Sequence, residues 1–170
     1  MVSLPNSAAH DALTDCVSGD VARGLARLFH NQGRTTLCEV PLPNGRRADM
    51  VAIDARGHII IVEIKVARGD LIGDGKWPDY LDWCDRFYWG LAPSLDASPL
   101  DCATRQPDRC GLIIADRYDA VIVREGRDHP LAAARRKSET LRLARLAMRR
   151  MMMASDPDLA VIVREGDIAL

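Results

Sequence analysis

The pattern of apolar and polar positions between residues 47 and 65 predicts two β-strands joined by a tight turn. The loop Ala55-Arg56-Gly57 ends on a glycine, which can adopt the left-handed backbone conformation that closes a three-residue hairpin loop. The register that this loop favours places Asp54 opposite His58. We therefore expect an antiparallel hairpin whose side chains alternate between two faces.

This hairpin carries acidic residues at strand positions. Counting back from the turn places Asp49 opposite Glu63, and both share a face with Lys65. Directly opposed residues have Cβ atoms about 5 Å apart, where two ionised carboxylates repel each other and favour a cation between them. A divalent metal ion would serve. The alternative is that Arg47 and Lys65 neutralise both carboxylates as ordinary ion pairs.

The surroundings of Glu63 favour the metal site. Its strand begins with the continuous apolar run Ile59 to Val62, which is typical of a strand covered on both faces. Charges that enter such a strand are costly unless they are coordinated or paired. Glu39, in a predicted strand over residues 35–40, would add a third carboxylate, although a solvent-facing position is the simpler interpretation.

The remaining periodicity predicts further helices and strands, as in an α/β protein. The expected elements are a helix from near Ser18 to about Gly33, capped by Ser18 or Asp20; a turn-rich loop over 66–76; a helix capped by Asp74; a strand over 86–91; a polar loop over 93–109; a hairpin of strands 111–116 and 120–125; and a long helix from Pro130 to about Met152. Most aromatic residues fall between Trp77 and Trp89. We interpret them as core packing rather than as a platform for stacking bases.

Composition narrows the classes of protein. The chain has 170 residues, 48% of them hydrophobic and 28% charged, which fits one ordinary globular domain. No apolar run has the length of a membrane span, and we expect a cytoplasmic protein without membrane contact. The five cysteines show no C-x-x-C pair, so we expect reduced, mostly buried thiols rather than disulfides or a zinc site.

A nucleic-acid partner would need a local basic surface, because the net charge is only -1. The long helix offers one, with seven basic residues and the single Glu139 between Ala132 and Arg150. On a helical wheel, four of the arginines fall within about a quarter turn: Arg135, Arg142, Arg145 and Arg149. This face is either a DNA-binding surface or a solvated one.

Several motifs resemble the MmcB family of bacterial DNA repair proteins between about Val21 and Arg150. They are Gly45-Arg46-Arg47-Ala48-Asp49, Val62-Glu63-Ile64-Lys65, Asp74-Gly75-Lys76-Trp77-Pro78-Asp79-Tyr80, Cys84-Asp85-Arg86-Phe87-Tyr88 and the stretch from His129 to Lys137. The family is assigned to the PD-(D/E)XK nuclease superfamily. The resemblance therefore implies a restriction-endonuclease-like core, a mixed sheet flanked by helices, and a role in DNA repair.

The resemblance also assigns roles to residues. Asp49 matches the motif aspartate, Glu63 the following acid and Lys65 the motif lysine, whereas Ala48 replaces a common proline and the first helix offers no clear glutamate. The implied activity is hydrolysis of DNA with Mg²⁺ or Mn²⁺ bound by Asp49, Glu63 and the carbonyl of Ile64.

Lys65 would then orient the attacking water. Lys76 would either hold a phosphate or be a solvated lysine at the start of a helix. The alternative function is a catalytically silent module of the same fold that binds damaged or branched DNA through the basic helix. A structural or partner-binding protein is the third class.

The end of the chain contains a repeat. The segment Ala120 to Gly126 recurs residue for residue as Ala160 to Gly166. We expect residues 1–17 to be a loosely ordered lead-in, residues 18–153 a nuclease-like domain, and residues 154–170 a tail with an extra strand. An apolar strand of this kind tends to pair at a sheet edge, so a homodimer contact is one expectation.

Overall fold

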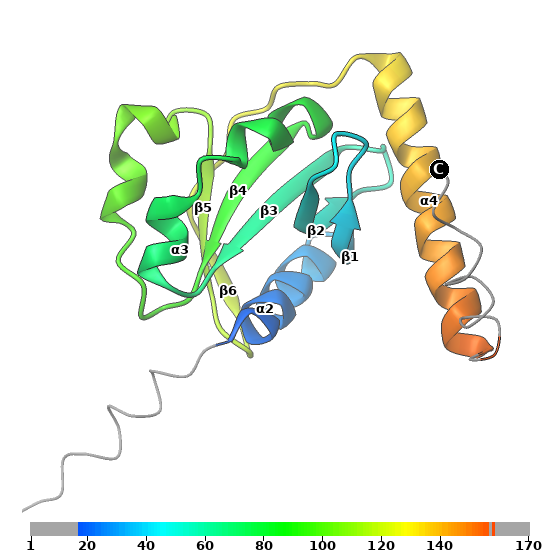
Figure 1. Ribbon diagram of the computed structural model, residues 1–170, viewed down its shortest axis with the longest axis horizontal. Helices are drawn as coiled ribbons and strands as arrows, with labels where there is room; N and C mark the ends of the chain where they lie inside the picture. Colours follow the sequence, from blue (N-terminus) through cyan, green and yellow to red (C-terminus); the bar gives the residue numbers. More distant parts are fainter. Residues whose placement is uncertain (1–16, 157, 159–170) are drawn as a thin grey trace, which may run out of the picture. The chain divides into compact units, whose positions relative to one another are not determined.

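The computed structural model describes residues 17–156 and 158 (Figure 1). The chain divides into two compact units, Met1–Leu131 and Ala132–Leu170. The first unit holds a β-sheet with its covering helices, and the second holds one long helix. Each unit is described by itself.

The first unit alternates strands with helices and short 3₁₀ segments. In chain order its described elements are α2 (Ser18–Asn31), β1 (Thr35–Pro41), β2 (Arg47–Ile53), β3 (Ile59–Lys65), α3 (Arg68–Gly73), the 3₁₀ helix η1 (Trp77–Trp83), β4 (Arg86–Leu91), the 3₁₀ helices η2 (Ser98–Asp101) and η3 (Ala103–Arg105), β5 (Gly111–Ala115) and β6 (Ala120–Arg124). The predicted α/β class is confirmed.

The strands form one mixed sheet in the order β1-β2-β3-β4-β5-β6. The first three strands are antiparallel, β4 and β5 continue parallel to β3, and β6 returns antiparallel to β5. A parallel connection needs a crossover, and α3 with η1 supplies it between β3 and β4. β3 therefore lies inside the sheet, between β2 and β4, and the crossover segment follows its last residue.

The register of the β2–β3 hairpin is the predicted one. Ile53 pairs with Ile59, and the N–H of Asp54 donates to the carbonyl of His58 over 3.2 Å. Gly57 has φ 77°, the left-handed conformation that the three-residue loop requires. The conformation of this turn therefore fixes the register of the whole hairpin.

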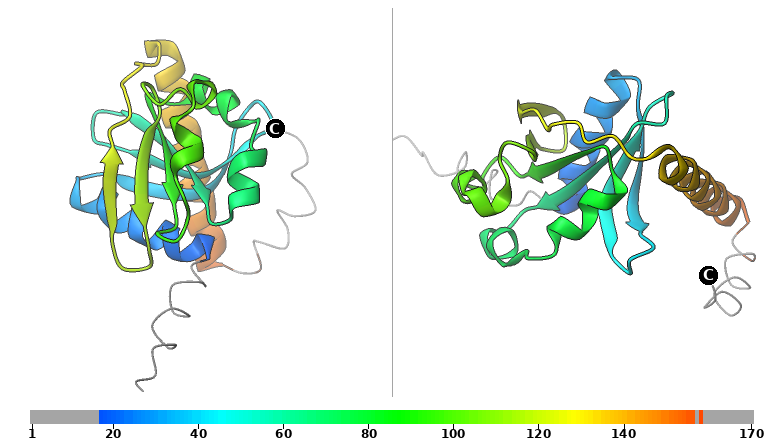
Figure 2. Two further views of the ribbon diagram at one scale, coloured as in Figure 1. Left: turned by 90° about the vertical axis from the view of Figure 1, so that its left-hand side faces the viewer. Right: turned by 90° about the horizontal axis from the view of Figure 1, so that it is seen from above.

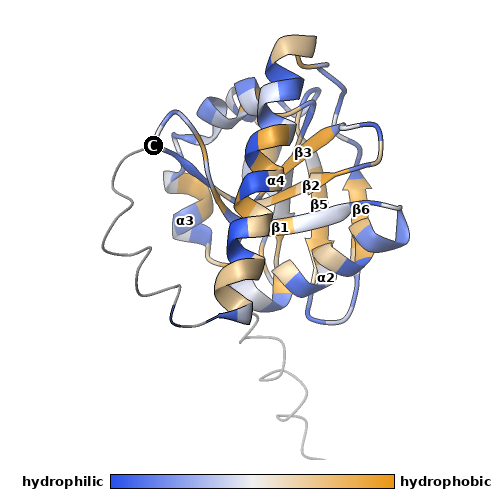
Figure 3. Cartoon of the chain, turned by 90° about the vertical axis from the view of Figure 1, so that its right-hand side faces the viewer, coloured by the Kyte–Doolittle hydropathy of each residue, from blue (hydrophilic) through white to orange (hydrophobic). Residues whose placement is uncertain are grey.

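Both faces of the sheet are covered. On one face α2 packs its stripe of Val21, Leu25 and Phe29 against β-strand residues such as Val62, while α3 and η1 cover the opposite face (Figure 2). All seven residues of β3 are buried, and Figure 3 shows hydrophobic colours on part of β2 and β3. The prediction of a β3 strand covered on both faces is confirmed.

The aromatic segment packs as core. The ring centroids of Trp77 and Phe87 lie 5.8 Å apart, and those of Phe87 and Trp89 lie 5.3 Å apart in an edge-to-face arrangement. All three residues are at most 3% exposed. These three rings are therefore buried in the core, which confirms the interpretation for them, and they offer no surface for stacking bases.

Some local predictions differ from the structure. Val17 is the N-cap of α2, without a side-chain cap, so neither Ser18 nor Asp20 caps the helix. The predicted loop over residues 66–76 contains α3, because its Leu71 is fully buried and anchors a helical turn. The loop over residues 93–109 likewise contains two 3₁₀ helices.

None of the four described cysteines forms a disulfide. Cys84 and Cys110 are buried, whereas Cys38 and Cys102 are exposed, so the prediction of mostly buried thiols is wrong for half of them. Cys38 lies in β1, the edge strand of the sheet, and Cys102 lies between two 3₁₀ helices. Neither position is covered by a layer of the core.

The second unit contains α4 (Ala133–Ser155), which confirms the predicted long C-terminal helix. Arg142 pairs with Glu139 one turn earlier, with Nη2 2.6 Å from Oε2. Exposed apolar side chains include Leu141, Met148 and Met151. Over the described residues, no helix combines the length and apolar character needed to cross a membrane. The repeat at residues 160–166 lies outside the described residues.

Candidate active site

A cavity of about 990 Å³ lies at the carboxyl end of β3. Asp49, Glu63 and Lys65 line it together with Asp70 and Asp74, so the structure brings the three predicted catalytic residues to one place. Lys76 lines the same cavity. The site is assembled by the ends of β2 and β3 and by the segment from α3 to η1.

Asp49 reaches the end of β3 as the hairpin register predicted. The paired ladder of β2 and β3 extends to Met50 and Val62, one position before Asp49 and Glu63. Beyond it, Oδ2 of Asp49 accepts the backbone N–H of Ile64 over 2.7 Å. Burial is the largest influence on this carboxyl and raises its pKa, although the Ile64 hydrogen bond opposes the shift. The carboxylate is thereby held against β3.

Glu63 is a buried carboxylate with one unsatisfied oxygen. Its exposed fraction is 6%, its Oε1 accepts from Nζ of Lys65 over 3.2 Å, and its Oε2 has no hydrogen-bond partner. Burial, followed by the nearby charge of Asp49, raises the pKa of Glu63 to about 8. A buried carboxylate whose pKa is raised further by a neighbouring carboxylate is a place where a cation is favourable.

Lys65 is surrounded by three carboxylates. Its Nζ lies 2.8 Å from Asp74, 3.2 Å from Glu63 and 3.6 Å from Asp70, and the residue is only 5% exposed. Burial opposes its charge, but the hydrogen bond to Asp74 and the neighbouring acids outweigh burial and raise the pKa of Lys65 above its usual range. The ammonium is therefore charged and fixed in direction.

Sequence reasoning missed Asp70 and Asp74 as members of the site. Asp74 was expected only as a helix cap, and its Oδ1 does accept the backbone N–H groups of Lys76 and Trp77 at 2.9 and 3.1 Å. Its Oδ2 holds Lys65 at the same time. The only signal in the sequence was that the turn-rich segment follows Lys65 directly.

Of the two cations in the alternative, Lys65 does pair with Glu63, whereas Arg47 forms its ion pair with Glu39. Nε of Arg47 lies 2.6 Å from Oε2 of Glu39, and both side chains are more than half exposed. Glu39 holds the register position opposite Asp49, between two paired positions of β1 and β2, with a φ of 53° that is uncommon for a residue other than glycine. Glu39 lines the cavity but faces solvent and Arg47.

The donor set fits a hard divalent cation. No group of three or more His, Cys, Asp or Glu side chains in the described part of the chain is arranged to hold a metal ion. Mg²⁺, however, is commonly bound by one or two carboxylates, with waters and substrate phosphate completing its octahedron. Asp49 with Glu63, one of whose oxygens is buried and unpartnered, offers that pair.

The four predicted DNA-binding arginines all lie on α4. Arg135 and Arg145 are exposed, and Arg142 and Arg149 are half-buried. The ion pair of Arg142 with Glu139 compensates the charge of one of these four arginines. DNA binding by this helix stays a prediction.

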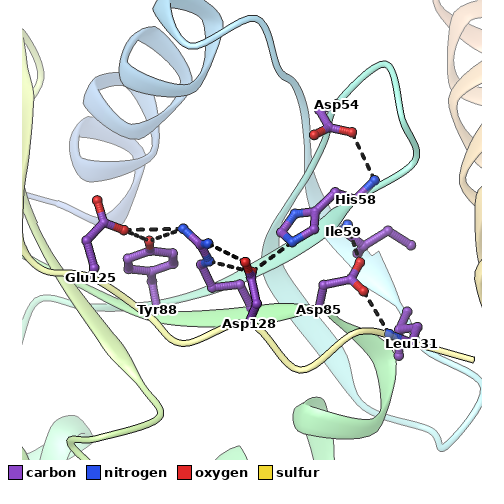
Figure 4. A network of polar contacts seen from close by, with 9 residues as sticks. Asp54, His58, Ile59, Asp85, Tyr88, Glu125, Asp128 and Leu131 are labelled. Carbon is purple, nitrogen blue, oxygen red and sulfur yellow. Dashed lines mark hydrogen bonds and ion pairs between the residues drawn. The ribbon is translucent and has the colours of Figure 1, made fainter.

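A second polar cluster lies around the opposite end of β3 (Figure 4). Asp85 is 1% exposed, and its two oxygens accept the backbone N–H groups of Ile59 and Leu131 at 2.7 and 2.8 Å. These bonds tie the start of β3 to the segment that follows β6. The Cys84-Asp85-Arg86 motif therefore has a structural explanation.

The same cluster continues through Arg86. Its guanidinium makes a two-point contact with Asp128 at 2.9 and 2.8 Å, and His58 contacts the same carboxylate at 2.9 Å (Figure 4). The hydroxyl of Tyr88 donates to Glu125 over 2.6 Å. These contacts hold residues 125–128 against β3 and β4 and lie outside the cavity that contains Glu63.

Comparison with known proteins identifies the family. A search of curated proteins gave no match. A solved structure of SPO1766, a protein of unknown function from Silicibacter pomeroyi, is 37% identical with a TM-score of 0.74, and the match covers 83% of this chain and 92% of that one. The family model described as DNA repair protein MmcB-like matches residues 6–158. The chain therefore belongs to the MmcB-like family of DNA repair proteins.

Proposed function

We propose that this protein is a metal-dependent deoxyribonuclease of the PD-(D/E)XK type that hydrolyses DNA phosphodiester bonds during repair. Membership of a DNA repair family supports DNA as the substrate class. A mixed sheet flanked by helices, with the acidic pair at the end of its central hairpin, is consistent with a restriction-endonuclease-like core.

The observation that carries this proposal is the state of Glu63. A buried carboxylate whose pKa is raised to about 8, which faces Asp49 and has one unpartnered oxygen, is costly for the fold. Asp85, the buried acid at the other end of β3, has a hydrogen bond at each oxygen. Costs of this kind are concentrated at functional sites, where a bound cation relieves them.

Each residue then has a chemical role. Asp49 and Glu63, with the carbonyl of Ile64, would hold Mg²⁺ or Mn²⁺, and the bound ion supplies an activated water and stabilises charge on the phosphate. Lys65 directs its ammonium at the attacking water, because Asp74 and Glu63 hold it from two sides. Lys76, at the edge of the cavity, contacts a phosphate of the DNA backbone. The water oxygen bonds to phosphorus, the bond to the leaving oxygen breaks, and the proton lost by the water ends on that leaving oxygen.

The test compares variants of the acidic pair with the unchanged protein. Asp49→Asn and Glu63→Gln should reduce cleavage that depends on Mg²⁺ or Mn²⁺ by about 1,000-fold or more, which is ~4 kcal/mol of barrier. DNA affinity should change little, because phosphate contacts set affinity. Arg56→Gln, on the hairpin turn away from the cavity, is a matched control.

Calorimetry gives a second readout. The unchanged protein should bind Mn²⁺, and Glu63→Gln should weaken that binding at least 10-fold. A protein that cuts neither single-stranded nor double-stranded DNA in either metal, and that binds no metal, would contradict the proposal.

One observation favours the second candidate, a catalytically silent module that binds damaged or branched DNA. The ammonium of Lys65 already contacts three carboxylates, so little of it faces the cavity. Retained DNA affinity with no turnover in the tests above, together with a preference for branched over linear duplexes, would establish this function instead.

A further inference from the structure

Arg105 holds the segment that supplies Asp74 to the site. It ends η3, more than 30 residues after that segment, and its guanidinium donates to the carbonyls of Leu71 and Ile72, each over 2.9 Å, and to the carbonyl of Asp74. The last carbonyls of a helix have no partner within the helix. Arg105 thus satisfies the end of α3 and fixes the chain that follows it.

The guanidinium itself sits on a rigid base. Its central carbon lies 5.5 Å from the ring centroid of Trp89, which is fully buried in β4. Trp89 is the direct neighbour of Glu63 in the β3–β4 register. A planar cation that stacks on an aromatic face and forks its donors to carbonyls has little freedom. The strands that carry the site therefore also fix the position of Arg105.

Asp74 links this arrangement to Lys65. Its carbonyl accepts from Arg105, and its carboxylate, 7% exposed, accepts from Nζ of Lys65 at 2.8 Å. The backbone N–H groups of Lys76 and Trp77 occupy the other carboxylate oxygen. Asp74 cannot turn away from Lys65 while these contacts hold.

We propose that Arg105 and Asp74 form a relay that positions the Lys65 ammonium in the active site. Arg105 acts through Asp74 and does not touch the reacting groups. This inference rests on the proposed nuclease function. In a nuclease the direction of the Lys65 ammonium matters because a water must be aligned with a phosphate. An error of about 1 Å in such an arrangement costs roughly 100-fold in rate.

The experiment compares Arg105→Gln with Arg105→Lys and Arg124→Gln. Arg124 is a matched control, since it also contacts this part of the chain, through Asp101 and the carbonyl of Cys110, but not the end of α3. Arg105→Gln should lower kcat for DNA cleavage by about 100-fold with little change in KM. Arg105→Lys should restore at least 10-fold of that loss, and Arg124→Gln should retain full turnover.

A spectroscopic readout tests the relay without turnover. The ¹H–¹⁵N signal of the Lys65 ammonium, assigned with Lys65→Arg, should shift or broaden in Arg105→Gln and stay unchanged in Arg124→Gln. If Arg105→Gln does not fold, Asp74→Asn, which keeps an acceptor for both N–H groups, should produce the same change of signal.

The outcomes separate the two proposals. A Lys65 signal that is unchanged in the folded variants overturns the relay, whatever happens to turnover. If the unchanged protein does not cleave DNA, the nuclease proposal fails, and a shifted signal still supports the positioning of Lys65 by Arg105 and Asp74.

Discussion

Glu63 and Asp85 are two buried carboxylates at opposite ends of β3, and they differ in their hydrogen bonds. Asp85 accepts a backbone N–H at each oxygen, from Ile59 and Leu131. Glu63 has one oxygen on Lys65 and one without a partner. Both residues are at most 6% exposed. Burial alone therefore does not distinguish a structural acid from a functional one.

The difference lies in what surrounds each group. The hydrogen bonds of Asp85 fasten the chain after β6 to the start of β3, so its charge is compensated within the fold. Glu63 faces a second acid, Asp49, across the hairpin, and its compensation is incomplete. A satisfied carboxylate stabilises the fold, whereas an unsatisfied one retains the capacity to bind a cation.

The largest expected effect on stability is that of Asp85→Ala. This change leaves the N–H groups of Ile59 and Leu131 without their acceptor, which should lower the free energy of unfolding by roughly 2–5 kcal/mol. Glu63→Gln should change it by less than about 1 kcal/mol at pH 7, because a side chain with a pKa of about 8 is already largely uncharged there, as the amide is. Urea unfolding measures both. Equal losses for the two variants would remove the distinction between the two ends of β3.

The pH dependence of stability sharpens the same comparison. Glu63 has a pKa of about 8 in the folded chain against 4.5 for the free side chain, so the folded state holds a proton that the unfolded state has lost. The free energy of unfolding should therefore fall as pH rises from about 4.5 to about 8. Thermal melting in metal-free buffer should show this slope.

Two controls isolate the contribution of Glu63 to that slope. Glu63→Gln should flatten it, and added Mg²⁺ should raise the melting temperature more at pH 8 than at pH 5. A slope that is identical in Glu63→Gln and in the unchanged protein would show that the pKa of Glu63 is not raised in the folded protein.

A smaller effect is expected from the basic helix α4, where Arg142 forms an ion pair with Glu139. Replacing Arg145 and Arg149 by glutamine should flatten the dependence of the logarithm of DNA affinity on the logarithm of salt by about two units. Arg142→Gln should change it less, since Glu139 already neutralises that guanidinium. Fluorescence anisotropy at several salt concentrations measures the slope. An unchanged slope would mean that the face is only solvated.

The smallest effect on folding is expected from the tail. A chain that ends after Ser155 keeps the first copy of the repeat, which forms β6 in the sheet, and loses the second copy at residues 160–166. Its melting temperature should stay within a few degrees of that of the full chain. Sedimentation would show a dimer contact as a shift from dimer to monomer, and loss of folding would show that the tail belongs to the sheet.

The local parts of this structure could be predicted because their causes are local. Alternation of apolar side chains and the loop ending in Gly57 were enough to align Asp49 with Glu63, and the long helical period was enough to predict α4. In each case the residues that decide the geometry lie close together in the chain. The mixed sheet, in contrast, was implied by the family resemblance and not by the order of apolar segments.

The partners of Lys65 and Glu63 were decided by tertiary structure. Asp74 and Asp70 reach Lys65 because α3 folds back over β3, and Arg105 holds that segment from a distant 3₁₀ helix. Arg47 turns to Glu39 rather than to Asp49. The physical reason is that an ion pair depends on the distance and burial of two side chains in space, and no periodicity along the chain encodes either quantity.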